Sequence, residues 1–504
     1  MPAQVRDVVG TSYLTNITAI ATGMASSYAL KSDGTMYSWG NNICGQLGIG
    51  NQLDKNLPVV VKDPSGTGTM SNIKQIASNI GYNNINMTAT TIAVKNDGTV
   101  WSWGCNDNGQ LGRGTNDALP HTLPLQVKDN LGTSVLTGID YIDVGQTHIL
   151  AKHNDGTVWA WGGNVNGQVG DNSISDRFLP VQVKDSSGTG TLSNIIKVVA
   201  GNGHSSALKS DGSLWSWGIN ANGQLGDNTT TQQNIPIQVK DQMGSGYLLN
   251  IKTMDCGNLF CLAVDNDGLV FGWGQNSSVN PTYGGTAIGQ AGYGENVQPA
   301  NRLLPTKILA AFTANSLTDI KDIAAGDRHV LVLKNDGTVW AWGANGNGQL
   351  GDGTTQQRYL PTQVKDQSGS GFLSNIVSIE AAGDNVYGSD SFAVDQDGTV
   401  WAWGSGISGK LGIGGNGSSL LPVKVKDSSG TGVLSNIKKV TAAGSYTLAL
   451  ANDGTIWSWG YNISGQLGDG TTLLRNLPVK VKNSDGTNFS NVSDISSSKA
   501  SITT

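Results

Sequence analysis

The sequence has few charged residues and no concentrated block of them. Lys, Arg, Asp and Glu make up 13% of the 504 residues, against about 25% in ordinary globular chains, and the formal net charge is −6. No run of Lys and Arg exceeds two residues, so the basic footprint of a nucleic-acid-binding protein is missing. No apolar run reaches the roughly eighteen residues that span a membrane. We therefore expect neither nucleic-acid binding nor membrane insertion.

Cysteine is also scarce. The four cysteines, Cys44, Cys105, Cys256 and Cys261, follow neither the spacing of a disulfide framework nor that of a zinc site. Only Cys256 and Cys261 are close enough in sequence to meet across one hairpin, and two isolated thiols are the favoured interpretation. We expect no cofactor and no metal ion.

The composition also bears on the compartment. Ser, Thr, Asn and Gly are abundant, with 70 glycines, while Lys and Glu are sparse, which favours an extracellular or cell-surface protein over the cytoplasmic alternative. The first residues, 1–7, contain no apolar secretory stretch. We interpret the chain as a mature or excised segment.

One short motif, Asp-Gly-x-x-aromatic-x-Trp-Gly, recurs eight times and organises the whole chain. From Gly40 to Gly460 the terminal glycine recurs in seven steps with a mean spacing of 60 residues. A period of this size indicates a solenoid, a propeller or an array, in which each unit buries its apolar face against the next. The copies begin at Asp33, Asp97, Asp155, Asp211, Asp267, Asp336, Asp397 and Asp453.

A single repeat contains four short strands. In the last complete copy, the alternation of polar and apolar residues predicts strands at 422–426, 437–444, 446–450 and 455–459. The Asp-Gly corner between the last two predicts a hairpin with a type I′ turn. The aromatic residues at i and i+2, such as Trp101 and Trp103, share one face of their strand, which the next repeat's sheet must cover. Four antiparallel strands repeated radially predict a β-propeller.

A second motif, Asn-x-x-Gly-Gln-Leu-Gly, follows the Trp-Gly pair, as at Gly45 to Gly48, with Gly409-Lys-Leu-Gly412 as a variant. We interpret its leucine as an anchor that pins a long loop onto the core.

Together, Ala-Gly-x-x-His, Ala-Leu-Lys-x-Asp-Gly-x-x-Trp-x-Trp-Gly and Asn-x-x-Gly-Gln-Leu-Gly resemble the repeat of the regulator-of-chromosome-condensation (RCC1-like) family over nearly the whole chain. The resemblance implies an all-β propeller, and implies functions that range from guanine-nucleotide exchange to inhibition of secreted enzymes. The family usually builds seven blades, whereas eight repeats predict eight four-stranded blades here, with seven as the alternative.

The ends of the chain supply more strands than eight blades need. Residues 2–7 and 17–23 precede the first Asp-Gly hairpin, and residues 478–482 and 492–495 follow the last. We therefore expect residues 1–504 to form one propeller domain, with 478–504 as an extra terminal strand pair. This pair lies loose, closes the ring, or pairs with a neighbouring molecule.

Candidate sites for ions and nucleotides have simpler structural explanations. His148, His204 and His329 each follow a glycine by three residues, while Ser26, Phe260 and Thr447 occupy that position in other repeats, so the histidines are expected to be structural and not a metal ring. The calcium-like starts at Asp265 and Asp395 coincide with the hairpin corner. The spacing G-x-G-x-x-G at 412–417 does not open a helix.

Interrupted repeats mark the better candidates for function. Repeat two lengthens one connection to residues 79–88, repeat seven inserts 384–390 in the equivalent connection, and repeat five lengthens the stretch between Gly274 and Gly289. Loops on a rigid scaffold commonly carry recognition, and tyrosine flanked by Gly, Asn and Ser suits adaptable binding. The predicted partner-binding residues are Tyr82, Asn83, Asn84, Tyr283, Tyr293, Asn385 and Tyr387. Neutral drift in loop length is the alternative.

The sequence thus predicts a non-enzymatic scaffold that binds a protein partner through loops on one face of the ring. The alternatives are a subunit of an extracellular filament assembled by exchange of terminal strands, a guanine-nucleotide exchange factor, and a propeller glycosidase or lyase with paired carboxylates.

Overall fold

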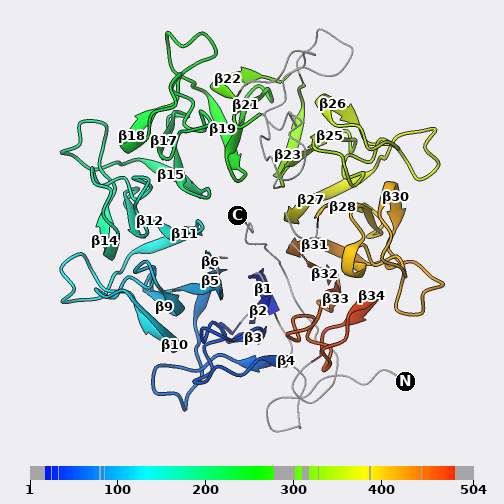
Figure 1. The fold of residues 1–504 in the computed structure, drawn as a ribbon, viewed down its shortest axis with the longest axis horizontal. Coiled ribbons are helices and arrows are strands. Elements are labelled where there is room, and N and C mark those ends of the chain that lie inside the picture. The colour runs from blue at the N-terminus through cyan, green and yellow to red at the C-terminus, as the bar shows by residue number, and fades with distance from the viewer. Residues whose placement is uncertain are drawn as a thin grey trace.

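Eight four-stranded antiparallel sheets are arranged radially in a closed ring (Figure 1). The computed structural model describes residues 17–482 apart from 24, 32, 79–80, 84–85, 277–300, 309–316, 327, 385–387 and 444. Within these residues, no helix is long and apolar enough to cross a membrane. The predicted all-β propeller with eight blades is confirmed.

The first half of the ring consists of blades 1 to 4. Blade 1 contains β1 (Ile17–Thr22), β2 (Ser26–Lys31), β3 (Met36–Gly40) and β4 (Lys55–Val60). Blade 2 contains β5 (Ile73–Ser78), β8 (Thr90–Lys95), β9 (Val100–Asn106) and β10 (Asp117–Gln126), and it carries the extra hairpin β6 (Gly81–Asn83) and β7 (Asn86–Thr88). Blade 3 contains β11 (Ile139–Val144), β12 (His148–His153), β13 (Val158–Gly162) and β14 (Arg177–Gln182). Blade 4 contains β15 (Ile195–Ala200), β16 (His204–Lys209), β17 (Leu214–Gly218) and β18 (Gln233–Gln238).

Blades 5 to 8 complete the ring. Blade 5 contains β19 (Ile251–Cys256), β20 (Phe260–Asp265), β21 (Val270–Gly274) and β22 (Arg302–Lys307). Blade 6 contains β23 (Ile320–Ala325), β24 (His329–Lys334), β25 (Val339–Gly343) and β26 (Arg358–Gln363). Blade 7 contains β27 (Ile376–Asp384), β28 (Gly388–Asp395), β29 (Val400–Gly404), the 3₁₀ turn η2 (Ile407–Gly409) and β30 (Ser419–Lys424). Blade 8 contains β31 (Ile437–Ala443), β32 (Tyr446–Ala451), β33 (Ile456–Gly460) and β34 (Arg475–Lys480).

The Asp-Gly corner joins the second and third strands of each blade, but the expected type I′ turn is wrong. In blade 8, Gly454 N–H donates to the Ala451 carbonyl and Ala451 N–H donates to the Thr455 carbonyl, both at 2.9 Å. Gly454 has a positive φ of 77°, but Asp453 before it does not have a positive φ, as a type I′ turn would require. The corner is therefore a three-residue loop in which a left-handed glycine closes the turn.

The fourth strand forms the outer edge of each blade. In blade 7 it starts at Ser419, three residues before the predicted start, and it contains Pro422. The register of β29 and β30 shifts between Ala402 and Gly404. Proline lacks an N–H donor, and an edge strand with an irregular register tolerates that loss.

The core consists of eight hydrophobic clusters, each formed by two neighbouring blades. The second tryptophan of the repeat is fully buried in each cluster, and in seven seams its indole N–H donates at 2.7–3.0 Å to the carbonyl of the residue that follows the first glycine of the preceding blade's Gly-Gln-Leu-Gly loop. These bonds run from Trp39 to Gln466, Trp103 to Gln46, Trp161 to Gln110, Trp217 to Gln168, Trp273 to Gln224, Trp403 to Gln349 and Trp459 to Lys410.

The last glycine of that loop makes the contact possible. At Gly226, which has φ +67°, an added Cβ would lie 3.0 Å from the indole nitrogen of Trp273. The two motifs of the repeat therefore meet across these seven seams. In each of them the loop contributes a backbone carbonyl that accepts the indole N–H, in addition to the predicted leucine anchor.

The ring closes between blades 8 and 1 through the same contacts as at the other seams. Trp39 bonds to the Gln466 carbonyl, and Ala29, Tyr37 and Trp39 share a cluster with Tyr446 and Leu448.

The terminal segments lie only partly within the described residues. Residues 478–480 are not spare, because they belong to β34 and pair with β33 of the same chain. Residues 17–22 form β1. The other surplus segments, 2–7 and 492–495, lie outside the described residues, as does the rest of 483–504.

Candidate functional site

The two ends of each blade carry different connections. In six blades the second strand begins opposite the last residue of the third strand, as in the pairs Ser26↔Gly40 and Tyr446↔Gly460, and in blades 2 and 7 the pairs Thr90↔Gly104 and Asp390↔Gly404 lie within two residues of those ends. The connection between the first and second strands therefore lies at the same end of the ring as the Gly-Gln-Leu-Gly loop. We call this end the hairpin face, and the opposite end, where the Asp-Gly corners lie, the corner face.

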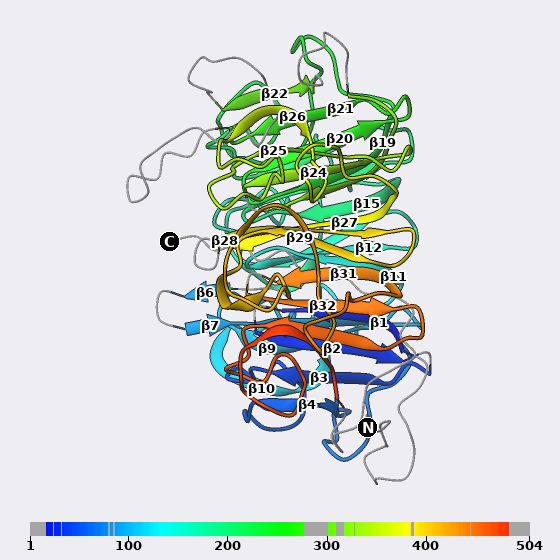
Figure 2. The same ribbon diagram turned by 90° about the vertical axis from the view of Figure 1, so that its right-hand side faces the viewer.

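Blade 2 adds a separate hairpin to the hairpin face. The first and second strands of blade 4 are joined by three residues, since β15 ends at Ala200 and β16 begins at His204. In blade 2 the same connection contains β6 and β7, whose register pairs Tyr82 with Met87 and Asn83 with Asn86. The hairpin projects beyond the ring (Figure 2). Tyr82 and Asn83 thus lie in β6, whereas Asn84 lies outside the described residues.

Blade 7 lengthens its own hairpin on the same face. Beyond the pair Ala381↔Ser391, β27 and β28 continue to Asp384↔Gly388. Asn385 and Tyr387, at the tip of this connection, lie outside the described residues. The strands that lead into the loops of repeats two and seven end at the same face of the ring, as expected.

The base of the blade 7 hairpin contains a buried ion pair. Lys410 Nζ lies 2.8 Å from Asp390 Oδ1 and donates to the Gly388 carbonyl at 2.6 Å, and both side chains are fully buried. Sister blades have histidine or other uncharged residues in place of Asp390, and glutamine in place of Lys410 in six described loops. Sequence reasoning recorded the Lys410 variant but missed the pair. The sequence does contain a signal for the pair, because Asp390 and Lys410 both depart from the usual residues within the same repeat.

The third candidate loop also starts from the hairpin face. It connects β21 with β22, and Tyr283 and Tyr293 lie outside the described residues. At its base, Asn301 Nδ2 donates to Asn222 Oδ1 of blade 4 at 2.9 Å, and Asn276 N–H donates to Asn301 Oδ1 at 3.2 Å.

The three histidines join neighbouring blades. His148 Nε2 lies 2.9 Å from Ser205 Oγ, and His329 Nε2 lies 2.9 Å from Ser391 Oγ. Burial lowers the pKa of His148 and of His329 to about 3, with further lowering from His204 and Lys410 respectively. The residue at this place in blade 8 is Tyr446, which bonds Ser27, and not Thr447 as the glycine spacing suggested. The glycine of Gly-x-x-His is required because an added Cβ at Gly145 would lie 2.3 Å from His148 Cε1.

The cysteines differ from the expectation of isolated thiols. Cys44 and Cys105 form a disulfide between the loop of blade 1 and the end of β9, and Cys256 and Cys261 form a second one across β19 and β20. The first pair was missed because its partners are 61 residues apart and meet only when two blades pack.

Side chains on the first strands bridge adjacent blades around the axis. The Gln75 amide exchanges two hydrogen bonds with the backbone of Ile142, at 2.8 and 2.9 Å. The Ala200 N–H donates to Asp143 Oδ2 at 2.9 Å, and Lys197 Nζ donates to the Met254 carbonyl at 2.7 Å. These polar contacts replace the backbone pairing that adjacent blades lack in this region.

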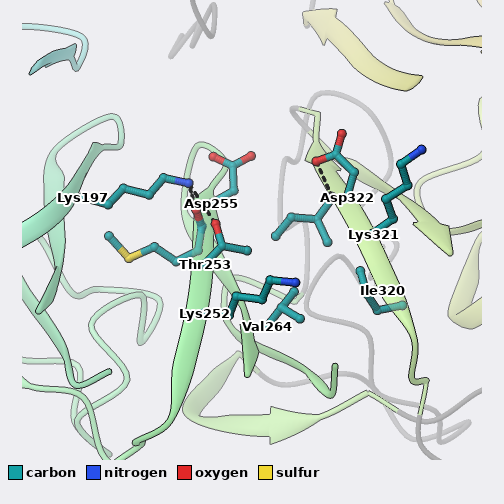
Figure 3. A pocket seen from close by; sticks show the side chains of 10 residues that line it. Lys197, Lys252, Thr253, Asp255, Val264, Ile320, Lys321 and Asp322 are labelled. Carbon is teal, nitrogen blue, oxygen red and sulfur yellow. Dashed lines mark hydrogen bonds between the residues drawn. The ribbon is translucent and has the colours of Figure 1, made fainter. Parts of the chain in front are cut away.

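Two acidic side chains line a small cavity between β19 and β23 (Figure 3). Burial raises the pKa of Asp322, and the charge of Asp255 raises it further. Each carboxylate accepts the next N–H of its own strand, and Lys197, Lys252 and Lys321 also line the cavity. Its volume of about 110 Å³ is well below the roughly 300–1,000 Å³ of ligand pockets. The cavity is therefore smaller than the pockets that usually bind small-molecule substrates.

Comparisons with known proteins confirm the family resemblance. The RCC1-like domain model matches residues 184–504, and the regulator of chromosome condensation (RCC1) repeat model matches 33–78, 97–151 and 155–208. Ultraviolet-B receptor UVR8 of Arabidopsis thaliana is 30% identical over 402 residues, which cover 78% of each chain. Human regulator of chromosome condensation is 26% identical over 444 residues, 83% of this chain and 91% of the relative.

A solved structure supports the fold. Prp20p of Saccharomyces cerevisiae is 22% identical and matches with a TM-score of 0.57, covering 83% of this chain and 92% of its own. The repeat signature, the radial sheets and these matches agree, and the chain belongs to the family of RCC1-like repeat propellers.

Proposed function

We propose that the protein is a non-enzymatic scaffold whose hairpin face binds a protein partner. The observation that supports this most directly is that the departures from the repeat gather on one face: the β6–β7 hairpin, the extended β27–β28 hairpin and the start of the long β21–β22 connection. The corner face keeps the regular Asp-Gly corner in every blade.

The physical basis is the contrast between a rigid ring and its added hairpins. Inter-blade tryptophan bonds and the buried Lys410–Asp390 pair fix the base of this face, so binding would order few additional groups. The contact residues we propose are Tyr82, Asn83, Asn84, Tyr283, Tyr293, Asn385 and Tyr387.

The relatives support a protein as the class of partner. The structure of Prp20p was described with its binding to Gsp1p and histones, and yeast RCC1 was also solved bound to Kap60. We carry over from these only the class, a protein, because their identity to this chain is 22%.

The test compares changes on the two faces. One variant carries Tyr82→Ser, Tyr283→Ser and Tyr387→Ser, and the matched control carries Met243→Ser and Tyr247→Ser, which are 82% and 55% exposed in the loop between β18 and β19. Partners captured by the wild-type chain are identified, and the affinity of each purified partner is then measured for all three proteins.

We expect the triple variant to weaken binding by at least tenfold, since tyrosine is enriched at interface hot spots. Because we propose that all three side chains lie at the partner-binding surface, the unfolding free energy of the variant should stay within about 0.5 kcal/mol of wild type. The control should bind like wild type. Equal affinity of the triple variant and wild type, or a loss confined to the control, would reject the hairpin face as the binding surface.

A further inference from the structure

Three potential metal ligands converge inside the seam between blades 4 and 5. His204 begins β16, Cys256 ends β19 and Cys261 lies near the start of β20. The ligand atoms of all three lie within 4.8 Å of one another, and each residue is at most 1% exposed. His204 Nε2 is 3.3 Å from Cys261 Sγ. It is the one group of three such residues among those that the structure describes.

The sister blades show that the fold does not require these cysteines. The facing pair Cys256↔Cys261 corresponds to Ala200↔Ser205 in blade 4 and to Ala381↔Ser391 in blade 7. At those seams the histidine of the preceding blade forms a hydrogen bond with the serine hydroxyl, as His148 does with Ser205. Packing of the seam therefore does not require a sulfur atom at either position. Both sulfur atoms lie beside His204, which contacts Cys261.

We propose that this cluster is a redox-gated binding site for a thiolate-preferring divalent cation, with Zn²⁺ as its ligand. Two thiolates and one imidazole nitrogen form a donor set that Zn²⁺ accepts with a fourth position remaining. The Ser206 hydroxyl lies within hydrogen-bonding distance of Cys256 Sγ, at 3.8 Å. Strands β16, β19 and β20 position the three donors, and the His204 ring packs so closely on Gly201 that an added Cβ there would lie 2.2 Å from Cε1.

The oxidised and metal-bound states exclude each other. The structure holds Cys256 and Cys261 as a disulfide. A dithiol reductant would break that S–S bond, leaving two thiols in the protein and forming a disulfide in the reductant. Binding of Zn²⁺ would then release the two thiol protons to solvent and leave both sulfurs as thiolates. A small-molecule disulfide would reverse this by thiol–disulfide exchange: the S–S bond of Cys256 and Cys261 forms again, the reagent leaves as two thiols after taking two protons from solvent, and the ion is released.

The test uses the full chain produced in a reducing, zinc-supplemented medium, so that the ion is present before the blades close around the site. Bound zinc is counted after gel filtration, and Co²⁺ substitution reports thiolate coordination through its sulfur-to-metal charge-transfer absorption. The cysteine variant is Cys256→Ala with Cys261→Ser, which gives blade 5 the residues of blade 4 and so protects folding. The histidine variant is His204→Gln, with His148→Gln as its matched control. A Cys44→Ser, Cys105→Ser variant controls for the other cysteines.

We expect one equivalent of zinc in the reduced wild type and in both controls, and none in the oxidised protein or the cysteine variant. His204→Gln should weaken zinc binding at least tenfold, as even changes around a ligand do. Zinc-free reduced wild type would overturn the proposal. So would equal zinc in the cysteine variant, or a chain that keeps the disulfide or unfolds when it is reduced.

Discussion

At the scale of single residues, the buried polar groups of the seams link stability to pH. His148 and His329 are fully buried, and each contributes one ring nitrogen to a hydroxyl of the next blade. The pKa of each is lowered from 6.5 to about 3, chiefly because burial penalises the imidazolium. Below pH 6.5 the unfolded chain therefore binds more protons than the native one.

This difference predicts a loss of stability in mild acid. The contribution of the two histidines is fully present above pH 6.5 and is lost as the pH falls toward 3, with a slope of up to about 1.4 kcal/mol per pH unit for each. In the variant His148→Gln, His329→Gln, the slope of the unfolding free energy against pH should be smaller than in wild type by roughly 2–3 kcal/mol per pH unit between pH 6 and pH 4.5. Denaturant titrations at several pH values measure this slope. An unchanged slope would mean that these histidines protonate without opening the seams.

The Lys410–Asp390 pair makes a second prediction at this scale. Asp390→Asn leaves the Lys410 ammonium buried without its counter-charge, and it should cost about 3–5 kcal/mol of unfolding free energy. The double change Asp390→His, Lys410→Gln installs the residues found at His329 and Gln349 of blade 6 and should recover most of that loss. A double variant as unstable as the single one would show that the pair is not an independent unit.

At the scale of elements, the strands were predictable because the same pattern occurs eight times along the chain. The alternating runs and the Asp-Gly corner gave the second and third strands within one or two residues. The turn type was wrong because Asp-Gly is compatible with two hairpin geometries, and the fourth strand was shifted because its proline and bulge break the alternation.

Contacts between elements were harder to predict than the elements. The Cys44–Cys105 disulfide and the indole-to-carbonyl bonds join different repeats, so no pattern within one repeat indicates them. The placement of Tyr82 and Asn83 on the hairpin face was accessible, because it follows from which strands their loop connects.

The seam contacts can be tested as matched elements. Trp39 at the closing seam and Trp217 inside the ring are both fully buried and donate to Gln466 and Gln168, whose carbonyls each also accept a serine hydroxyl. Trp39→Phe and Trp217→Phe should each lower the unfolding free energy by roughly 1–3 kcal/mol, from one lost hydrogen bond and a small cavity. Denaturant unfolding measures both. A loss confined to Trp217→Phe would mean that the closing seam contributes little.

At the scale of the whole molecule, the ring is complete without exchanging a strand. Each of the eight blades takes its four strands from one continuous stretch, from β1 to β34, and blades 8 and 1 meet through side chains. A filament built by strand exchange would need an incomplete blade, and each blade within the described residues has its four strands. A closed ring also gives the hairpin face the fixed geometry that a binding scaffold needs.

The molar mass of the purified chain, measured by light scattering over a wide range of concentrations, tests this closure most directly. A ring closed within one chain predicts a constant mass of 52.4 kDa. A mass that grows without limit as the concentration rises would contradict closure.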